Sequence, residues 1–344
     1  MLSISKKLLV WYDGVARDLP WRATRDPYAI WVSEIMLQQT RVETVIPYYE
    51  RFMSRFPTPR ALAEADEDSV LSLWSGLGYY RRARLLHAGV REVVAQYGGD
   101  VPEDPNARRA LPGVGRYTAG AIGSIAFDRR EPVVDGNVTR VLTRLFRIRT
   151  PVGETTTTKR LWTEAEKLVP ADRPGDFNQA LMELGATVCV PRQPKCNACP
   201  LVRECGAHAH GEVDALPVSK PKKAPVSVNL SAVVVTAGRG RERKLWLVKA
   251  DHALFGGLWG VPMSQGEPKD ALRDAGLRAR LRSEQAGQVE HLLSHRRLRV
   301  AIYRASGGRG EASATRRPFR AEELDGVGVS TLTRKLLEAA FPRD

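Results

Sequence analysis

The sequence predicts a chain of two parts, an all-helical unit followed by a small α/β domain. Up to about residue 205, helical stretches alternate with turns that carry proline or glycine, and no strand-like alternation interrupts them. A stretch rich in Pro and Lys over residues 216–225 then predicts an extended linker. Beyond it, short runs rich in Val, Leu and Trp are separated by glycines, as in a sheet.

The elements can be placed in order along the chain. Asp26-Pro27 supplies a cap and then a proline at the first helical position, which predicts a helix over residues 28–40. Further helices are expected over residues 69–74, 82–96, 118–127, 138–146, 159–168 and 177–187. Strands are expected over 231–236, 245–249, 258–263 and 298–305, and helices over 271–281 and 331–341. The expected divisions are a helical unit over 1–210, a linker over 211–227 and the α/β domain over 228–344.

The formal net charge of +14 favours a polyanionic partner such as DNA. The excess is concentrated in residues 218–344, which hold 24 basic and 13 acidic side chains. A basic protein from a GC-rich genome is the alternative, because Arg greatly outnumbers Lys. No apolar run reaches the ~18 residues of a membrane span and no signal peptide is evident, so we expect a cytoplasmic protein.

Leu111-Pro112-Gly113-Val114-Gly115, ahead of an Ala/Gly-rich helical run, predicts the turn of a helix-hairpin-helix. Gly113 and Gly115 allow backbone angles that other residues resist. The free amides of the turn and the N-terminus of the next helix form an anion site that suits a DNA phosphate. The motif therefore indicates DNA binding without sequence readout, and the alternative is a helix-to-helix turn of no function.

Two carboxyl groups stand in contrasting surroundings. Glu34 lies in a strongly apolar helical run, where lost solvation raises the pKa of a carboxyl and lets it act as an acid near neutral pH. Asp135 precedes the helix expected over 138–146, where amides and the helix dipole favour the charged form. Such a pair suits acid catalysis beside electrostatic stabilisation. The alternatives are a solvent-facing Glu34 and a simple N-cap at Asp135.

Polar and aromatic side chains follow. Gln38, Gln39 and Thr40 carry amide and hydroxyl groups that can hydrogen-bond base edges. The stretch over residues 77–82 includes Tyr79, whose flat ring can stack on bases or wedge between them. A tyrosine of the core at the start of a helix is the alternative for that stretch.

The four cysteines of the chain lie within residues 189–205, in a C-x6-C-x2-C-x5-C pattern. In a cytosolic chain such clustering predicts a metal site rather than disulfides. Four thiolates suit either an iron–sulfur cluster or tetrahedral zinc. The residues concerned are Cys189, Cys196, Cys199 and Cys205.

The order of these motifs resembles that of the adenine DNA glycosylases of the MutY family, within the helix-hairpin-helix DNA glycosylase superfamily. The matching stretches are residues 19–22, 31–40, 76–80, 111–115 and 134–138 and the cysteine loop. The resemblance implies a base excision repair enzyme that acts on double-stranded DNA with 8-oxoguanine:A or G:A mispairs. Such an enzyme flips the adenine out of the duplex and hydrolyses its N-glycosidic bond.

The resemblance implies a role for each matching residue. Glu34 would protonate adenine at N7, Asp135 would stabilise the oxocarbenium-like sugar, and Asn137 would orient that region. Tyr117 occupies the slot of the catalytic lysine in endonuclease III-like enzymes, which implies a monofunctional glycosylase. The cysteines would hold a [4Fe–4S] cluster. The residues expected to contact DNA or the lesion are Arg22, Gln38, Gln39, Thr40, Leu77, Tyr79, Gly113, Gly115, Ser294 and His295.

The C-terminal part resembles the Nudix-like domain with which this family recognises 8-oxoguanine. The carboxylate-rich box of Nudix hydrolases is not found here, which argues against a nucleotide-pool hydrolase. Ser294 and His295 match the lesion-reading loop, although Leu293 stands where the family usually has Phe. We expect a monomer associated with the nucleoid. A related glycosylase for another base, or a non-catalytic damage-binding protein, is the alternative.

Overall fold

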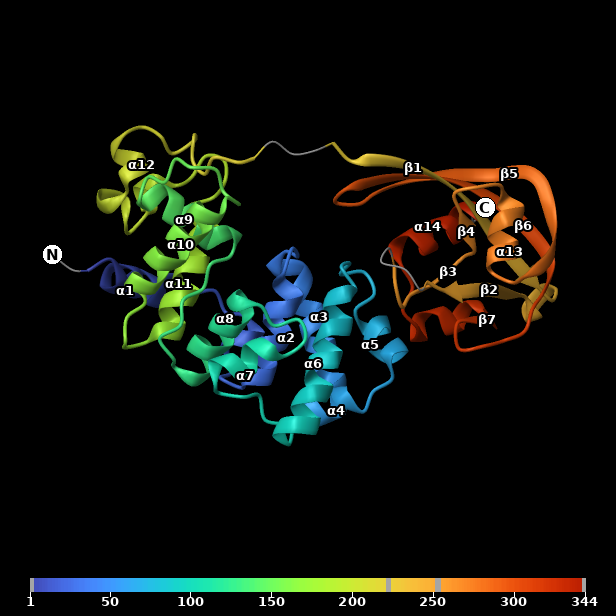
Figure 1. Ribbon diagram of the computed structural model, residues 1–344, viewed down its shortest axis with the longest axis horizontal. Coiled ribbons are helices and arrows are strands. Elements are labelled where there is room, and N and C mark those ends of the chain that lie inside the picture. Colours follow the sequence, from blue (N-terminus) through green and yellow to red (C-terminus); the bar gives the residue numbers. More distant parts are fainter. Residues whose placement is uncertain (1–2, 221–223, 251–254, 342–344) are drawn as a thin grey trace. The chain divides into compact units, whose positions relative to one another are not determined.

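In a computed structural model of the chain, residues 3–220, 224–250 and 255–341 are described. Residues 221–223 of the expected linker lie outside this range. The chain forms two compact units (Figure 1). The first comprises Met1–Ala63 and Ala88–Pro221, and the second comprises Glu64–His87 and Lys222–Asp344.

The first unit consists of helices joined by turns and loops, as the sequence predicts. Its helices are α1 (Ile4–Val15), α2 (Pro27–Leu37), α3 (Val42–Arg55), α4 (Pro59–Ala63), α7 (Pro105–Ala110), α8 (Arg116–Phe127), α9 (Gly136–Leu145), α10 (Thr155–Leu168), α11 (Pro174–Thr187) and α12 (Gly206–Ala209). Among the residues described in both units, no helix is long and apolar enough to cross a membrane.

Helix α2 carries Glu34 and is the most deeply buried helix of this unit. Pro27 occupies its first turn, and the Asp26 side chain caps it by accepting a hydrogen bond from the Tyr28 amide at 3.0 Å. Residues 28–36 are all buried, because α2 packs against both α3 and α8 (Figure 1). The sequence places the helix correctly but extends it three residues too far.

A second apolar core joins α1, α9, α10 and α11. Leu8, Val141, Leu161 and Leu181 come from these four helices and are each at most 3% exposed. Full burial of such side chains contributes roughly 1.5–3 kcal/mol each. This core fixes α9, and therefore Asp135 at its N-terminus, against α11.

The second unit contains a mixed sheet. Its strands are β1 (Val226–Ala237), β2 (Lys244–Lys249), β3 (Trp259–Gly260), β4 (Met263–Ser264), β5 (Arg278–Leu292), β6 (Arg296–Arg309) and β7 (Arg316–Phe319). The main order is β3-β2-β1-β6-β5, with β4 beside β1 and β7 beside β2. Only β1 and β6 run parallel among these described pairs.

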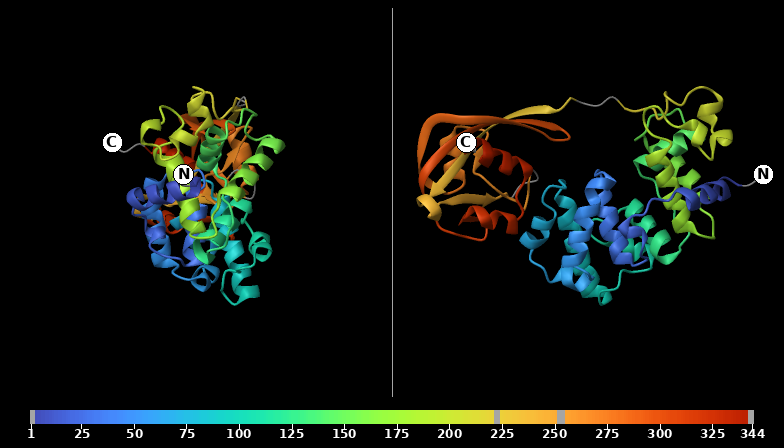
Figure 2. Two further views of the ribbon diagram at one scale, coloured as in Figure 1. Left: turned by 90° about the vertical axis from the view of Figure 1, so that its left-hand side faces the viewer. Right: turned by 180° about the vertical axis from the view of Figure 1, so that it is seen from behind.

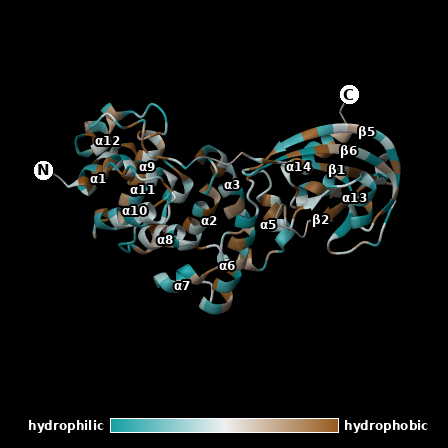
Figure 3. Cartoon of the chain, turned by 45° about the horizontal axis from the view of Figure 1, so that its top comes forward, coloured by the Kyte–Doolittle hydropathy of each residue, from teal (hydrophilic) through white to brown (hydrophobic). Residues whose placement is uncertain are grey.

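Helices cover both faces of this sheet (Figure 2). Helix α14 (Thr331–Ala340) packs on one face over Val300 and Ile302, whereas α13 (Pro268–Asp274) packs on the other over Val233 and Val235. Buried and exposed residues alternate along much of β6, and its hydropathy alternates accordingly (Figure 3). A helical unit with a small α/β domain confirms the predicted fold class.

Several predicted elements differ from those of the structure. The helix expected over 271–281 is wrong in its second half, because α13 ends at Asp274 and β5 begins at Arg278. The strand expected over 258–263 is two short strands, β3 and β4. The sequence predicts no helix at α1 or α3, although both are amphipathic.

The second unit also takes in a helical segment from the N-terminal half of the chain. Helix α5 (Glu67–Leu73), the loop over residues 74–80 and the first turns of α6 (Arg81–Tyr97) belong to it. Helix α6 then continues into the first unit. The linker expected over residues 211–227 does not predict that residues 64–87 belong to the second unit.

Candidate active site

A pocket of about 680 Å³ in the first unit brings together most of the predicted site residues. It lies between the hairpin turn, α2, the N-terminus of α9 and one side of α11. The predicted residues that line it are Arg22, Glu34, Gln38, Gln39, Thr40, Gly113, Gly115, Tyr117, Asp135 and Asn137. Residues from four distant stretches of sequence therefore share one cavity.

Glu34 is 4% exposed and projects from α2 into this pocket. The Tyr117 hydroxyl donates a hydrogen bond to Glu34 Oε2 at 2.5 Å. Burial raises the pKa of Glu34 to about 7, with a further rise from the Asp135 charge, whereas the Tyr117 hydrogen bond and Arg22 lower it. As the sequence predicts, this carboxyl exchanges its proton near neutral pH.

Asp135 caps α9 with both carboxylate oxygens occupied. Oδ1 accepts from the Val138 amide at 2.7 Å, and Oδ2 accepts from Asn137 Nδ2 at 3.1 Å. Burial nevertheless raises the pKa of Asp135 above its usual value, although these hydrogen bonds and Arg140 lower it. The amides at the N-terminus of α9 favour the charged form of Asp135, as expected, but desolvation outweighs them and raises the pKa on balance.

Asn137 is held in turn by Arg140 on α9. Arg140 Nη2 donates to Asn137 Oδ1 at 2.8 Å and to the Gly185 carbonyl at 2.7 Å. Its Nε donates to the Cys189 carbonyl at 2.7 Å. The guanidinium therefore links the carboxyl cap of α9 to the start of the cysteine loop.

Glu183 is a pocket residue that sequence reasoning missed. It projects from α11 and is 2% exposed. Its Oε1 accepts from Arg17 Nε at 2.5 Å and its Oε2 accepts from Arg22 Nη2 at 2.7 Å. Burial alone would raise the pKa of Glu183, but the two arginines lower it on balance. An acidic residue in an otherwise apolar helical run was the available signal, as it was for Glu34.

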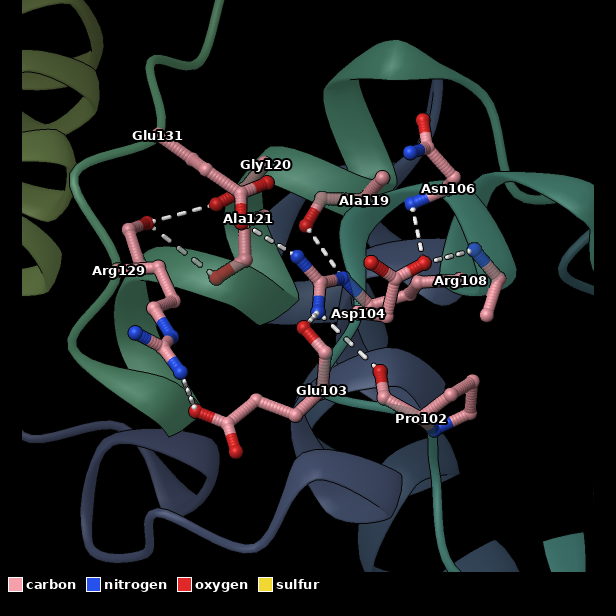
Figure 4. A network of polar contacts seen from close by, with 12 residues as sticks. Pro102, Glu103, Asp104, Asn106, Arg108, Ala119, Gly120, Ala121, Arg129 and Glu131 are labelled. Carbon is pink, nitrogen blue, oxygen red and sulfur yellow. Dashed lines mark hydrogen bonds and ion pairs between the residues drawn. The ribbon is translucent and has the colours of Figure 1, made fainter.

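The hairpin turn is braced by one buried arginine on α7 (Figure 4). Arg108 is fully buried and donates to the carbonyls of Ala119, Pro102 and Glu103 at 2.7–3.2 Å. It also pairs with Glu131 at 2.5 Å. These contacts fix the two helices on either side of residues 111–115.

The two glycines of the turn differ. Gly113 has φ +78°, a region that favours glycine. Gly115 is the N-cap of α8 with φ −85° and ψ 179°, and a Cβ there meets nothing within 4 Å. The expectation that both positions need glycine's freedom is therefore wrong for Gly115.

The stretch after Glu34 turns sharply at the pocket. Gln39 has φ +59°, in the left-handed region, and Gln38 Nε2 donates to Thr118 Oγ1 at 3.4 Å. Thr40 Oγ1 donates to the Gln38 carbonyl at 3.4 Å. The backbone thus changes direction where α2 ends and lines the pocket with amide and hydroxyl groups.

The other predicted DNA contacts form a separate group in the second unit. Tyr79 is 47% exposed, and its hydroxyl lies 3.0 Å from Ser294 Oγ in the turn between β5 and β6. Leu77 is 6% exposed, so it belongs to the core in this conformation. His295 is exposed, and its carbonyl accepts from the Val226 amide at 3.0 Å.

The four cysteines are free thiols in the loop after α11. Cys189 and Cys199 pack against the core of α9 and α11, and buried Arg144 donates to Cys189 Sγ at 3.4 Å. Burial raises the pKa of Cys196, with further contributions from Cys189 and Cys205, so these thiols affect one another electrostatically. In the described part of the chain, no group of three or more His, Cys, Asp or Glu side chains could hold a metal ion.

Comparison with known families agrees with this architecture. Residues 32–168 match the HhH-GPD superfamily of base excision DNA repair proteins, and residues 233–339 match the NUDIX domain. The protein is thus of the class of HhH-GPD repair proteins, with an added C-terminal NUDIX-like domain.

Similarity to complete proteins defines the family within that class. The chain is 40% identical to adenine DNA glycosylase of Rattus norvegicus and 37% identical to that of Homo sapiens. Each alignment covers 96% of this chain, and 76% and 72% of the relatives. The chain belongs to the adenine DNA glycosylase family, whose members are DNA N-glycosylases.

Solved structures resemble the helical unit. A thermostable thymine-DNA glycosylase is 33% identical over 60% of this chain and 95% of that one, with a TM-score of 0.54. An endonuclease III trapped on DNA covers 61% of this chain and 99% of that one, with a TM-score of 0.52. At 22% identity, the second likeness concerns the fold alone.

Proposed function

We propose that this protein hydrolytically removes adenine mispaired with 8-oxoguanine, or with guanine, from duplex DNA. The observation that carries the proposal is the triplet Glu34, Tyr117 and Asp135 in one buried pocket. Because the pKa of Glu34 is about 7, a large fraction of this carboxyl is protonated at neutral pH. A proton donor inside a pocket on a DNA-repair fold suits the release of a purine base.

Glu34 and Asp135 would have different roles in the reaction. The adenine leaves the base stack and enters the pocket. Glu34 donates its proton to N7, the bond between N9 and C1′ breaks, and the bonding electrons leave with the base. The Asp135 carboxylate, oriented by Asn137, stabilises the positive charge on the sugar until water adds at C1′ and gives up a proton to the solvent, which leaves a hydroxyl there.

The reaction would end at an abasic site. Schiff-base formation at C1′ requires an amine, and no lysine is among the described residues that line the pocket. The Tyr117 hydroxyl is instead engaged with Glu34 and Met182. We therefore infer a monofunctional glycosylase without strand-cleaving activity.

The lesion would be recognised by residues of the second unit. The contact between Tyr79 and Ser294 offers a ring and a hydroxyl side by side, which suits stacking and hydrogen bonding to 8-oxoguanine. Gln38, Gln39, Thr40 and the hairpin turn would contact the duplex beside the pocket. We propose a monomer that acts on DNA in the cytoplasm.

The cysteine loop would hold a [4Fe–4S] cluster. Four free, partly buried thiols within residues 189–205 are of the donor type that such a cluster uses, and their side chains would have to move together to bind it, because they do not form a metal-binding group as they now lie. When bound, the cluster would tie the ends of the loop together without entering the reaction. Iron and acid-labile sulfide with a brown visible absorbance would support it, whereas colourless protein with zinc would reject it.

The decisive experiment is single-turnover adenine release from duplexes with one 8-oxoguanine:A or one G:A pair, with and without alkali. The proposal expects cleavage of the adenine strand only after alkali, and faster release opposite 8-oxoguanine. Cleavage without alkali would contradict the monofunctional assignment. Release in a Glu34→Gln variant would contradict the role of the acid, and no release by folded, DNA-bound protein would indicate a damage-binding function.

A further inference from the structure

Trp259 of β3 is the centre of a buried cluster in the second unit. It is 1% exposed and packs edge-to-face on Phe319, with ring centroids 4.8 Å apart. Its amide donates to the Gly328 carbonyl at 2.8 Å and its backbone pairs with Val329. The position of the indole is therefore fixed by the sheet.

The indole N–H of Trp259 reaches the start of α5. Nε1 donates to Asp68 Oδ1 at 3.2 Å, and Lys249 Nζ approaches the same oxygen at 2.9 Å. The Lys249 and Asp68 side chains are only 19% and 25% exposed, so solvent screens this ion pair less than a surface pair. A single carboxylate oxygen thus receives both donors.

The C-terminal end of α5 is held by Val329, which forms a β-bridge with Trp259. Ser75 Oγ donates to the Val329 carbonyl at 2.9 Å. Between the two ends, Leu71 lies so close to Gly328 that a Cβ on Gly328 would come within 2.6 Å of it. Asp68, Trp259, Lys249, Ser75 and Val329 therefore form an "α5 dock" that grips the helix at both ends.

The loop that follows α5 is held by two side-chain hydrogen bonds to one of its carbonyls. Gly76, Gly78 and Tyr79 have φ values of +105°, +70° and +48°, so three residues within four adopt left-handed angles. Trp74 Nε1 and Arg82 Nη2 each donate to the Gly78 carbonyl at 3.2 Å. A displacement of α5 would accordingly be carried through this loop to Tyr79.

We propose that Asp68 is a positioning residue for lesion discrimination. Through the α5 dock it sets where Tyr79 stands relative to Ser294, the two side chains whose oxygens lie 3.0 Å apart. Asp68 does not line the pocket that holds Glu34, which belongs to the other unit. This inference rests on the proposed recognition of 8-oxoguanine.

The experiment compares single-turnover adenine release from 8-oxoguanine:A and G:A duplexes in full-length variants. Asp68→Ala removes the acceptor, whereas Trp259→Phe removes the donor and keeps an aromatic ring. Asp68→Asn keeps an acceptor for the indole. Trp246→Phe is the matched control, because Trp246 is 5% exposed in the same sheet and donates its Nε1–H to the Gly308 carbonyl at 3.1 Å, outside the dock.

We expect Asp68→Ala and Trp259→Phe each to reduce the ratio of the two rates by about tenfold, since each breaks a partly buried hydrogen bond to a charged group. The G:A rate should stay within about twofold, because Glu34 and Asp135 are untouched. Asp68→Asn should restore most of the ratio, and Trp246→Phe should leave it unchanged. Hydrogen exchange of residues 74–80 should quicken in the first two variants only.

Three results separate the possibilities. A wild-type ratio of one would reject the proposed lesion recognition, and with it this role of Asp68. A wild-type preference that survives in Asp68→Ala and Trp259→Phe would reject only the role of Asp68. An equal fall of both rates, matched by Trp246→Phe, would show that these residues serve stability alone and would also overturn the inference.

Discussion

The folded environment of Glu34 opposes the ionisation of its carboxyl group. Its pKa is about 7 in the fold and 4.5 ordinarily, so between these values the folded chain holds a proton that the unfolded chain releases. The free energy of unfolding therefore falls as pH rises through this window. The same burial that readies the acid for proton donation makes the site unfavourable for stability.

Glu34→Gln should consequently gain stability as it loses activity. At about pH 8 we expect its free energy of unfolding to exceed that of the wild type by up to ~3 kcal/mol, and near pH 4 the difference should vanish. Urea unfolding at both pH values measures this. A difference independent of pH would mean that Glu34 does not carry the buried proton.

Tyr117→Phe should shift the pH dependence of the chemical step. The Tyr117 hydroxyl stabilises the charged form of Glu34, so its loss should raise the pKa of Glu34 above about 7. The alkaline limb of the rate profile should therefore move to higher pH by roughly half a unit to one unit. Single-turnover rates from pH 5 to 9 measure the limb. Met182→Leu, which keeps the Tyr117–Glu34 bond, should leave the limb in place.

The raised pKa of Glu34 can be predicted from the sequence, because an acidic side chain in a run of apolar residues loses solvation when that run is buried. The raised pKa of Asp135 cannot be predicted in this way, since the sequence shows the helix N-terminus but not how much the fold desolvates it. The place of Glu183 in the pocket cannot be predicted from the sequence, because its two arginine partners are about 160 residues away in the chain.

The stability of the helix-hairpin-helix depends on the guanidinium group of Arg108. Arg108→Met should destabilise the fold by roughly 3–5 kcal/mol, because three carbonyls and the Glu131 carboxylate lose a buried donor. Thermal unfolding and duplex affinity are the measurements, and both should fall. Arg129→Gln is the control, since its ion pair with Glu103 is more than half exposed and should contribute under ~1 kcal/mol.

Elements with strong boundary signals could be predicted, whereas the longest strand could not. Strand β5 runs from Arg278 to Leu292 and is mostly exposed or half-buried, so it has few fully apolar positions. Its first residues follow α13 directly, and the short run 271–281 therefore suggests one helix rather than a helix and a strand. Pairing with β6 decides the outcome, and that is a tertiary interaction.

The whole molecule is strongly basic, and its affinity for DNA should reflect this. With a net charge of +14, binding to an undamaged duplex should weaken by at least about tenfold between 50 and 200 mM salt, because phosphate contacts release counterions. Fluorescence anisotropy at a series of salt concentrations tests this. An affinity that scarcely changes with salt would mean that the positive charge is not used for phosphate contacts.

The two-part architecture is visible in the sequence, but the composition of the second unit is not. Glu64–His87 has an ordinary helical pattern, and nothing in its residues reveals that it packs with a sheet whose first strand begins at Val226. Asp68 resembles any acidic residue in the first turn of a helix. Only the folded chain shows the indole and the ammonium that share its carboxylate.

This arrangement limits how the protein can be shortened. A fragment ending at residue 220 would keep α5 but lose the surface that shelters it. Leu71, now 0% exposed against Gly328, would face water, and Asp68 would lose both donors. Such a fragment would carry a newly exposed apolar patch, prone to self-association. Kinetic constants from truncated protein would therefore describe a damaged surface rather than an isolated catalytic domain.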